Sequence, residues 1–197
     1  MKKIGIIIFL LSFISSYSQS GPIKNFRILD SLIQKQAILF AEIIKTKNIN
    51  KIRLNFSENP ASWLVKQHFY SAFTEKKIEV NYESDTGNPI LNVNIKTIAI
   101  DYLLYNQDND SLIRNATVDI DANLSSSGNI EIISNGKSLF KDIISREDIN
   151  FIKSDNEFAN APVPEKKKTF FEEIAIPFVV VTTAILTVVI LFTVRSG

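Results

Sequence analysis

The feature that most constrains this chain is an uncharged apolar run near its C-terminus. Residues 174–194 read IAIPFVVVTTAILTVVILFTV and contain no ionisable side chain. As a helix, about 21 residues cover roughly 31 Å, which matches the hydrocarbon core of a bilayer. Because backbone groups in lipid must be satisfied internally, the run predicts one transmembrane helix over 174–194, followed by a tail, 195–197.

The residues in and around this span indicate what it contacts. With no charge inside it, a proton or ion relay through the helix is not expected. Thr183 and Thr187 lie one turn apart and form a possible face for a partner helix; alternatively, their hydroxyls bond back to their own backbone. The residues expected at the membrane interface are the basic and aromatic ones that flank the span: Lys166, Lys167, Lys168, Phe170, Phe171 and Arg195.

The first residues have the pattern of an export signal. A basic start is followed by the apolar residues 4–14, which are too few to cross a bilayer, and then by Ser16 and Ser18, which suit a cleavage site. This pattern predicts a signal peptide over 1–18, with an uncleaved N-terminal anchor as the alternative.

An export signal and one span together predict a single-pass protein of the inner (cell) membrane, with its domain in the periplasm and the tail in the cytoplasm. The lysines at 166–168 oppose this orientation, because positive residues prefer the cytoplasmic side of a span. We expect the export signal to prevail, since large domains are translocated largely regardless of charge.

Composition excludes several classes of site. The chain has no cysteine, which excludes disulfides, thiolate metal sites, cysteine nucleophiles and lipid attachment to a cysteine. Its formal net charge is +1 and its charges are mixed along the chain, unlike the basic domain of a nucleic-acid binder. The expected partners are therefore membrane lipid and another envelope protein, and no nucleic acid.

Residues 21–153 predict one extracytoplasmic domain, because apolar residues recur there with the helical period or alternate with polar ones. The elements predicted in its first half are a helix over 26–45 capped by Asn25, a strand over 51–56, a helix opened by Asn59 and Pro60 that runs to 76, and a strand over 78–82. Residues 154–173 lack periodicity and contain two prolines, which predicts a flexible tether and juxtamembrane segment.

The second half predicts hairpin-linked strands over 90–105, 116–124, 130–133 and 137–144. In the first of these the inward set changes near Thr97, which predicts a bulge or a bend. Asn135 and Gly136 predict a tight hairpin. All these elements together predict an α+β domain, with two helices packed on a mixed, largely antiparallel sheet.

No catalytic, cofactor-binding or metal-binding site is predicted. His68 is the only histidine, and without an evident partner acid or nucleophile it is expected to be structural. Asp108 and Asp110 lie in a turn that lacks the glycine and the closing glutamate of a calcium loop. Asp119 and Asp121 share one strand face and are expected to be solvated, with acid–base catalysis as the alternative.

One family resemblance covers residues 25–105. Leu29-Asp30-Ser31-Leu32 opens the first predicted helix, and the strand 52–56, the helix 62–73 and the strand 78–82 follow. This order resembles the periplasmic α/β domain of curli-secretion lipoproteins and penicillin-binding-protein activators. The resemblance implies a non-enzymatic protein that binds or assembles envelope machinery. Those families carry a lipidated cysteine, whereas this chain has a C-terminal span, which favours the inner membrane.

The function predicted from these observations is a membrane-anchored periplasmic interaction or assembly module that docks onto an envelope protein complex and is not an enzyme. Two alternatives stand beside it. One is a single-pass accessory subunit of a transporter or secretion system that acts through its transmembrane helix. The other is a hydrolase that uses the carboxylates of the second half.

Overall fold

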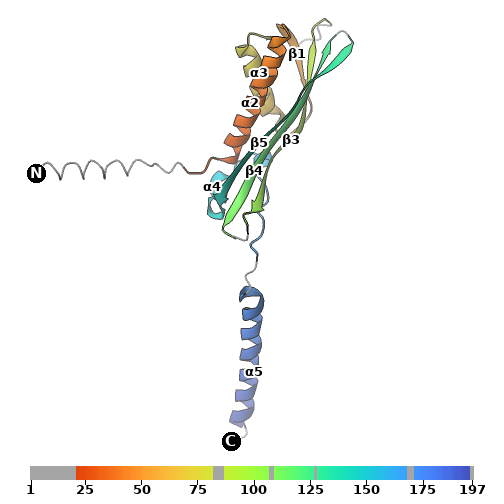
Figure 1. Cartoon of the computed structure of the whole chain (residues 1–197). Helices are drawn as coiled ribbons and strands as arrows, with labels where there is room; N and C mark the ends of the chain where they lie inside the picture. Colours follow the sequence, from red (N-terminus) through yellow and green to blue (C-terminus); the bar gives the residue numbers. More distant parts are fainter. Residues whose placement is uncertain (1–20, 82–86, 107–108, 127, 168–170, 196–197) are drawn as a thin grey trace, which may run out of the picture. The chain divides into compact units, whose positions relative to one another are not determined.

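The structure, a computed structural model, describes residues 21–81, 87–106, 109–126, 128–167 and 171–195 (Figure 1). The chain divides into two compact units, one that ends at Pro162 and one that begins at Val163. The predicted signal peptide, 1–18, lies outside the described residues.

The first unit is a five-stranded mixed sheet with two long helices on one face (Figure 1). Its main elements are α2 (Asn25–Thr46), β1 (Lys51–Phe56), α3 (Ser62–Glu75), β2 (Glu79–Asn81), β3 (Ile90–Leu104), β4 (Ser111–Ser126) and β5 (Asn129–Ser145). The order across the sheet is β2-β1-β3-β4-β5, with β1 parallel to β2 and β3, and with β3, β4 and β5 antiparallel. The α+β class and the mixed, largely antiparallel sheet are therefore confirmed.

The number of helices differs from the prediction. A short helix, α4 (Ile149–Ile152), follows β5, with 3₁₀ turns at Arg146–Asp148 and Glu157–Ala159. The two long helices have the predicted positions, although α3 begins at Ser62 rather than at Pro60, after the Asn59 side chain accepts a hydrogen bond from the Ala61 amide.

The core lies between the helices and one face of the sheet. The predicted helix stripes are buried, and the Phe40 ring of α2 lies 5.5 Å from the Phe69 ring of α3. Strands β3 and β4 contribute alternate residues to the same core, because successive side chains of a strand point to opposite faces. Among the described residues of the first unit, no helix lies on the other face of β3, β4 and β5 (Figure 1).

The predicted irregularity in β3 is confirmed. The pairing register between β3 and β4 shifts between Ile95 and Thr97, so one extra residue is absorbed there. Residues on both sides of the shift remain buried, with Val93 and Ile95 before it and Ile98 and Ile100 after it. The bulge therefore lets one long strand keep its apolar side toward the helices.

The predicted hairpin at Asn135 and Gly136 is wrong. Both residues lie inside β5, opposite Asp121 and Ile120 of β4, and the strand is continuous from Asn129 to Ser145. A hairpin turn would need positive φ at both positions, and of the described glycines only Gly128, in the β4–β5 turn, has it, with φ of 84°. Long pairing with β4 outweighs the local turn preference.

Gly136 has a different role, in the packing of α2 on the sheet. A Cβ atom added there would stand 3.6 Å from the amide carbon of Gln36 and 3.3 Å from the Ile120 carbonyl oxygen. The Gln36 amide donates to the Gly136 carbonyl at 2.8 Å and to the Val118 carbonyl at 2.9 Å. The glycine therefore allows a buried polar side chain of the helix to reach the strand backbone.

Two predictions about the ends of this unit are corrected. Asn25 does not cap α2; it is the first helical residue, it is buried, and its side chain donates to the Ala159 carbonyl at 3.0 Å. Residues 154–160 are therefore part of the folded unit rather than of a flexible tether, since Ala159 is buried and Asn160 donates to the Ser154 and Asn156 carbonyls.

The second unit contains a π-helical turn, Phe171–Ala175, that leads into α5 (Ile176–Arg195). By length and composition, the helix over Glu173–Thr193 is sufficient to cross a membrane. This agrees with the predicted span.

Candidate docking surface on the open sheet face

The open face is the side of β3, β4 and β5 that points away from α2 and α3. Its residues on β4 occur at every second position from Ile113 to Asn123, because the intervening residues are buried against the helices. The strand pairs set these side chains in rows across the three strands. The face therefore has a definite order of apolar and polar rows.

An apolar group occupies one end of the open face. Leu103, Ile113 and Ile143 lie opposite one another on β3, β4 and β5, and Leu139 lies further along β5. Exposed fractions of 54% for Leu103, 63% for Leu139 and 54% for Ile143 leave much of this group in contact with solvent. Exposed apolar side chains that gather on one surface are a common feature of protein interaction sites.

The middle of the open face is charged. The Lys96 ammonium pairs with the Asp121 carboxylate, and this hydrogen bond is the main cause that raises the pKa of Lys96, with a further contribution from the charge of Asp119. Asp119 and Asp121 each have one buried carboxylate oxygen without a hydrogen-bond partner among the described residues. Both carboxylates are thus half-buried rather than fully solvated, which differs from the expectation for this strand face.

The third part of the open face is an asparagine ladder. Asn55 of β1 donates to Asn92 of β3 at 3.0 Å, and Asn92 donates to Asn123 of β4 at 3.1 Å. The ladder links three strands in register. Ile132 of β5 lies opposite Asn123 and is 80% exposed, so an apolar side chain stands where the ladder ends.

The strand β5 forms one edge of the sheet. It has 17 residues, whereas β2 at the opposite edge has three. Its exposed apolar residues are Ile130, Ile132, Leu139 and Ile143, and its exposed cations Lys137 and Lys141 stand on the open face opposite Asp119 and Asn115. A long apolar edge strand is a surface onto which another strand can pair.

The predicted interface residues around the span all belong to the second unit. Lys166 and Lys167 are exposed, Phe171 is the first residue of the π-helical turn, and Arg195 is the last residue of α5. Lys168 and Phe170 lie outside the described residues.

The Thr183 and Thr187 hydroxyls donate to the Val179 and Thr183 carbonyls, each at 2.8 Å. The structure therefore has the backbone bonding that was one of the two interpretations of this pair. The use of Thr183 and Thr187 as a face for a partner helix stays a prediction.

Two polar clusters were not predicted from the sequence. The His68 ring nitrogen Nε2 lies 2.7 Å from the Asp30 carboxylate of α2, so the histidine does have a partner acid. Among the described residues, no group of three His, Cys, Asp or Glu side chains is placed to hold a metal ion. The two residues lie 38 positions apart, and the sequence carries no signal that pairs them.

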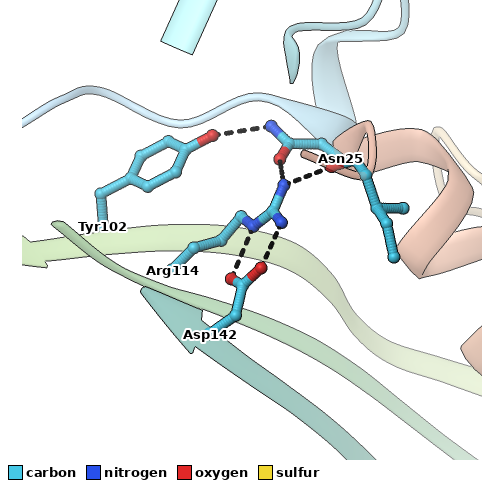
Figure 2. A network of polar contacts seen from close by, with 5 residues as sticks. Asn25, Tyr102, Arg114 and Asp142 are labelled. Carbon is cyan, nitrogen blue, oxygen red and sulfur yellow. Dashed lines mark hydrogen bonds and ion pairs between the residues drawn. The ribbon is translucent and has the colours of Figure 1, made fainter. Parts of the chain in front are cut away.

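The second cluster is a buried network around Arg114 (Figure 2). The Arg114 guanidinium donates to both carboxylate oxygens of Asp142, at 2.9 and 2.5 Å, and to the Asn25 side-chain oxygen at 3.0 Å. The Asn25 amide in turn donates to the Tyr102 hydroxyl at 2.7 Å. One signal could have indicated it: Arg114 occupies an inward position of a strictly alternating strand, where a charge requires a buried partner.

Comparisons with known proteins give little help. No family model matches the chain, and no curated protein matches it. Among solved structures, the chain is similar to a crystal structure of a minor lipoprotein from Acinetobacter baumannii, with 13% sequence identity and a TM-score of 0.32, over 50% of this chain and 68% of that chain. At this TM-score the likeness carries no inference about this protein.

Proposed function

We propose that this protein is a membrane-anchored docking module of the cell envelope, and not an enzyme, and that it binds an extended segment of another envelope protein along β5. The observation that carries the proposal is the edge strand itself. Asn129–Ser145 pairs with β4 on one side only, and its apolar residues on the open face are more than half exposed.

The binding mode follows from the physics of an unpaired strand. A strand at the edge of a sheet has backbone N–H and C=O groups free to pair with an added strand, and side chains of alternate residues then provide specificity. β5 is long enough for an added strand of ordinary length, which is about 5–6 residues.

The side chains of β5 indicate the chemistry of the segment it binds. Lys137 and Lys141 are exposed and alternate with Leu139 on the open face. An added strand would place its own alternate residues beside them, and opposite charges or apolar pairs in these positions stabilise strand pairing. The expected segment therefore alternates acidic residues, next to the lysines, with apolar residues next to Leu139 and Ile143.

Site-specific photo-cross-linking in cells tests this proposal. A cross-linking side chain in place of Lys141, on β5, is expected to capture one envelope protein through a segment of this acidic and apolar pattern. The same side chain in place of Lys66, which is exposed on α3, is the matched control and should not capture it.

Leu139→Lys is expected to abolish the cross-link at position 141 while the domain stays folded, because Leu139 is 63% exposed and not part of the core. A cross-link that survives Leu139→Lys would show that β5 is not the docking strand. A cross-link to a second copy of this chain would show that β5 serves self-association and does not bind a segment of another envelope protein.

A further inference from the structure

A second surface, distinct from the open face, surrounds the point where the chain leaves the first unit. The Phe26 ring of α2 lies 6.2 Å from the Trp63 ring, nearly parallel to it, and 6.4 Å from the Phe158 ring. Trp63 is 48% exposed. The three rings come from three separate segments, so tertiary packing builds an aromatic surface that is open to solvent.

Two further exposed apolar side chains belong to segments beside the start of α2. Phe151 of α4 and Ile23 are each 56% exposed, and the Lys24 ammonium lies 5.8 Å from the centre of the Phe151 ring. We call Ile23, Phe26, Trp63, Phe151 and Phe158 the exit cluster. Phe158 immediately precedes Ala159, whose carbonyl accepts from Asn25, the residue next to Phe26. The cluster is thus joined to the last residues that the first unit holds.

The chain length beyond this cluster limits what can reach it. Residues 161–172 connect Asn160, the last residue tied into the first unit, to the apolar helix that begins at Glu173. Even a fully extended chain of about 12 residues reaches at most ~42 Å. By contrast, a strand of the length of β4 is itself roughly 53 Å long. The exit cluster therefore lies within one short chain length of a membrane that holds the apolar helix.

We propose that the exit cluster inserts into the headgroup layer of the membrane that holds α5. Tryptophan suits this layer because its ring buries apolar area while the indole N–H keeps a polar partner, and the phenylalanine rings add apolar area. The Lys24 ammonium above Phe151 suits it too, since lysine extends its charge toward phosphate while its stem lies on apolar surface. The tether holds the cluster at high local concentration, so a small patch suffices.

The inference concerns a different surface from the proposed docking strand, because no residue of β5 belongs to the exit cluster. It depends only on the helix over Glu173–Thr193 crossing a bilayer. Either of the two proposals can therefore fail without the other.

The test uses the fluorescence of Trp63, the only tryptophan of the chain. The full chain is reconstituted in phosphatidylcholine bicelles, whose two faces are both open to solvent. Phosphatidylcholine brominated on its acyl chains is expected to quench Trp63 emission, and iodide in the water is expected to quench it less than in a lipid-free denatured control. Emission that is unchanged by brominated lipid and fully open to iodide overturns the proposal.

Substitutions separate lipid contact from general effects. Phe151→Ser is expected to lower the ratio of lipid-docked to free domain about tenfold, equivalent to ~1.4 kcal/mol, because it removes apolar area from the headgroup layer. Leu39→Ser removes a side chain that is 46% exposed on α2, outside both proposed surfaces, and should leave the quenching unchanged. Equal loss of quenching in both variants also overturns the proposal. Because the bicelles contain only lipid, a surface that binds a protein instead gives no quenching there, and that outcome overturns the proposal too.

Discussion

Replacing Asp142 with alanine is expected to destabilise the first unit more than replacing Arg114 with methionine, although each change breaks the same ion pair. Arg114 is completely buried, and its guanidinium donates four hydrogen bonds, of which two go to Asp142 and the others to Asn25 and the Ile23 carbonyl. Asp142→Ala leaves this charge buried among neutral acceptors only. Removing one partner of such a pair costs about 3–5 kcal/mol.

The reverse change is milder because the remaining charge can hydrate. The Asp142 side chain is 31% exposed, so water reaches its carboxylate once the guanidinium is gone. Arg114→Met then leaves the Ile23 carbonyl and the Asn25 oxygen without their donor, which costs about 1–3 kcal/mol. The double variant, Arg114→Met with Asp142→Ala, should be more stable than Asp142→Ala alone, since no unpaired charge is left.

Urea unfolding of the full chain in detergent, followed by Trp63 fluorescence, measures these free energies. The reasoning is refuted if Asp142→Ala lies within about 1 kcal/mol of the unchanged protein, which is the effect of an ordinary substitution. It is also refuted if the double variant is less stable than Asp142→Ala, because the penalty of the unpaired guanidinium would then not be the main cost.

Three other outcomes are expected. Burial raises the pKa of the Tyr102 phenol, so above pH 10 the unfolded chain ionises before the folded one and stability falls as pH rises. At neutral pH the unchanged protein should be about 1 kcal/mol more stable than Tyr102→Phe. This difference should shrink above pH 10 in urea titrations. Lys77 follows α3 with φ of 56°, and the Ile78 amide donates to the Phe73 carbonyl. Lys77→Gly should therefore add about 0.5–1 kcal/mol to the free energy of unfolding, because glycine adopts this backbone conformation without strain. A lower free energy of unfolding would contradict the backbone argument. Exchanging residues 174–194 for an unrelated apolar helix should keep the cross-link at position 141; its loss from protein that remains in the membrane fraction would favour an accessory subunit acting through its span.

The parts of the fold that the sequence predicts are those set by short-range periodicity. The alternation of β1 and β4, and the apolar stripes of α2 and α3, depend on side chains that lie a few residues apart, so they are visible locally. The bulge at Thr97 could be predicted for the same reason, because the alternation of apolar and polar residues changes phase within one strand.

The sequence fails where contacts between distant residues overrule local preference. Asn135 and Gly136 prefer a turn, but continuous pairing with β4 and the approach of Gln36 hold them in a strand. Asn25 prefers a helix cap, yet its partners Tyr102 and Ala159 lie 77 and 134 residues away. On the docking surface, the exposure of Leu139 and Ile143 likewise depends on β5 being the edge strand, which only the strand order reveals.

The Arg114 network links the proposed docking strand to the last residues of the first unit. Asp142 lies on β5, Arg114 on β4, and Asn25 on α2, and the Asn25 amide holds the Ala159 carbonyl where the chain leaves the first unit. The Arg114 bonds in this network are charge-assisted and therefore stronger than neutral ones, whereas the bond from Asn25 to Ala159 is neutral. One buried set of contacts thus holds together β5, β4, the start of α2 and the end of the first unit.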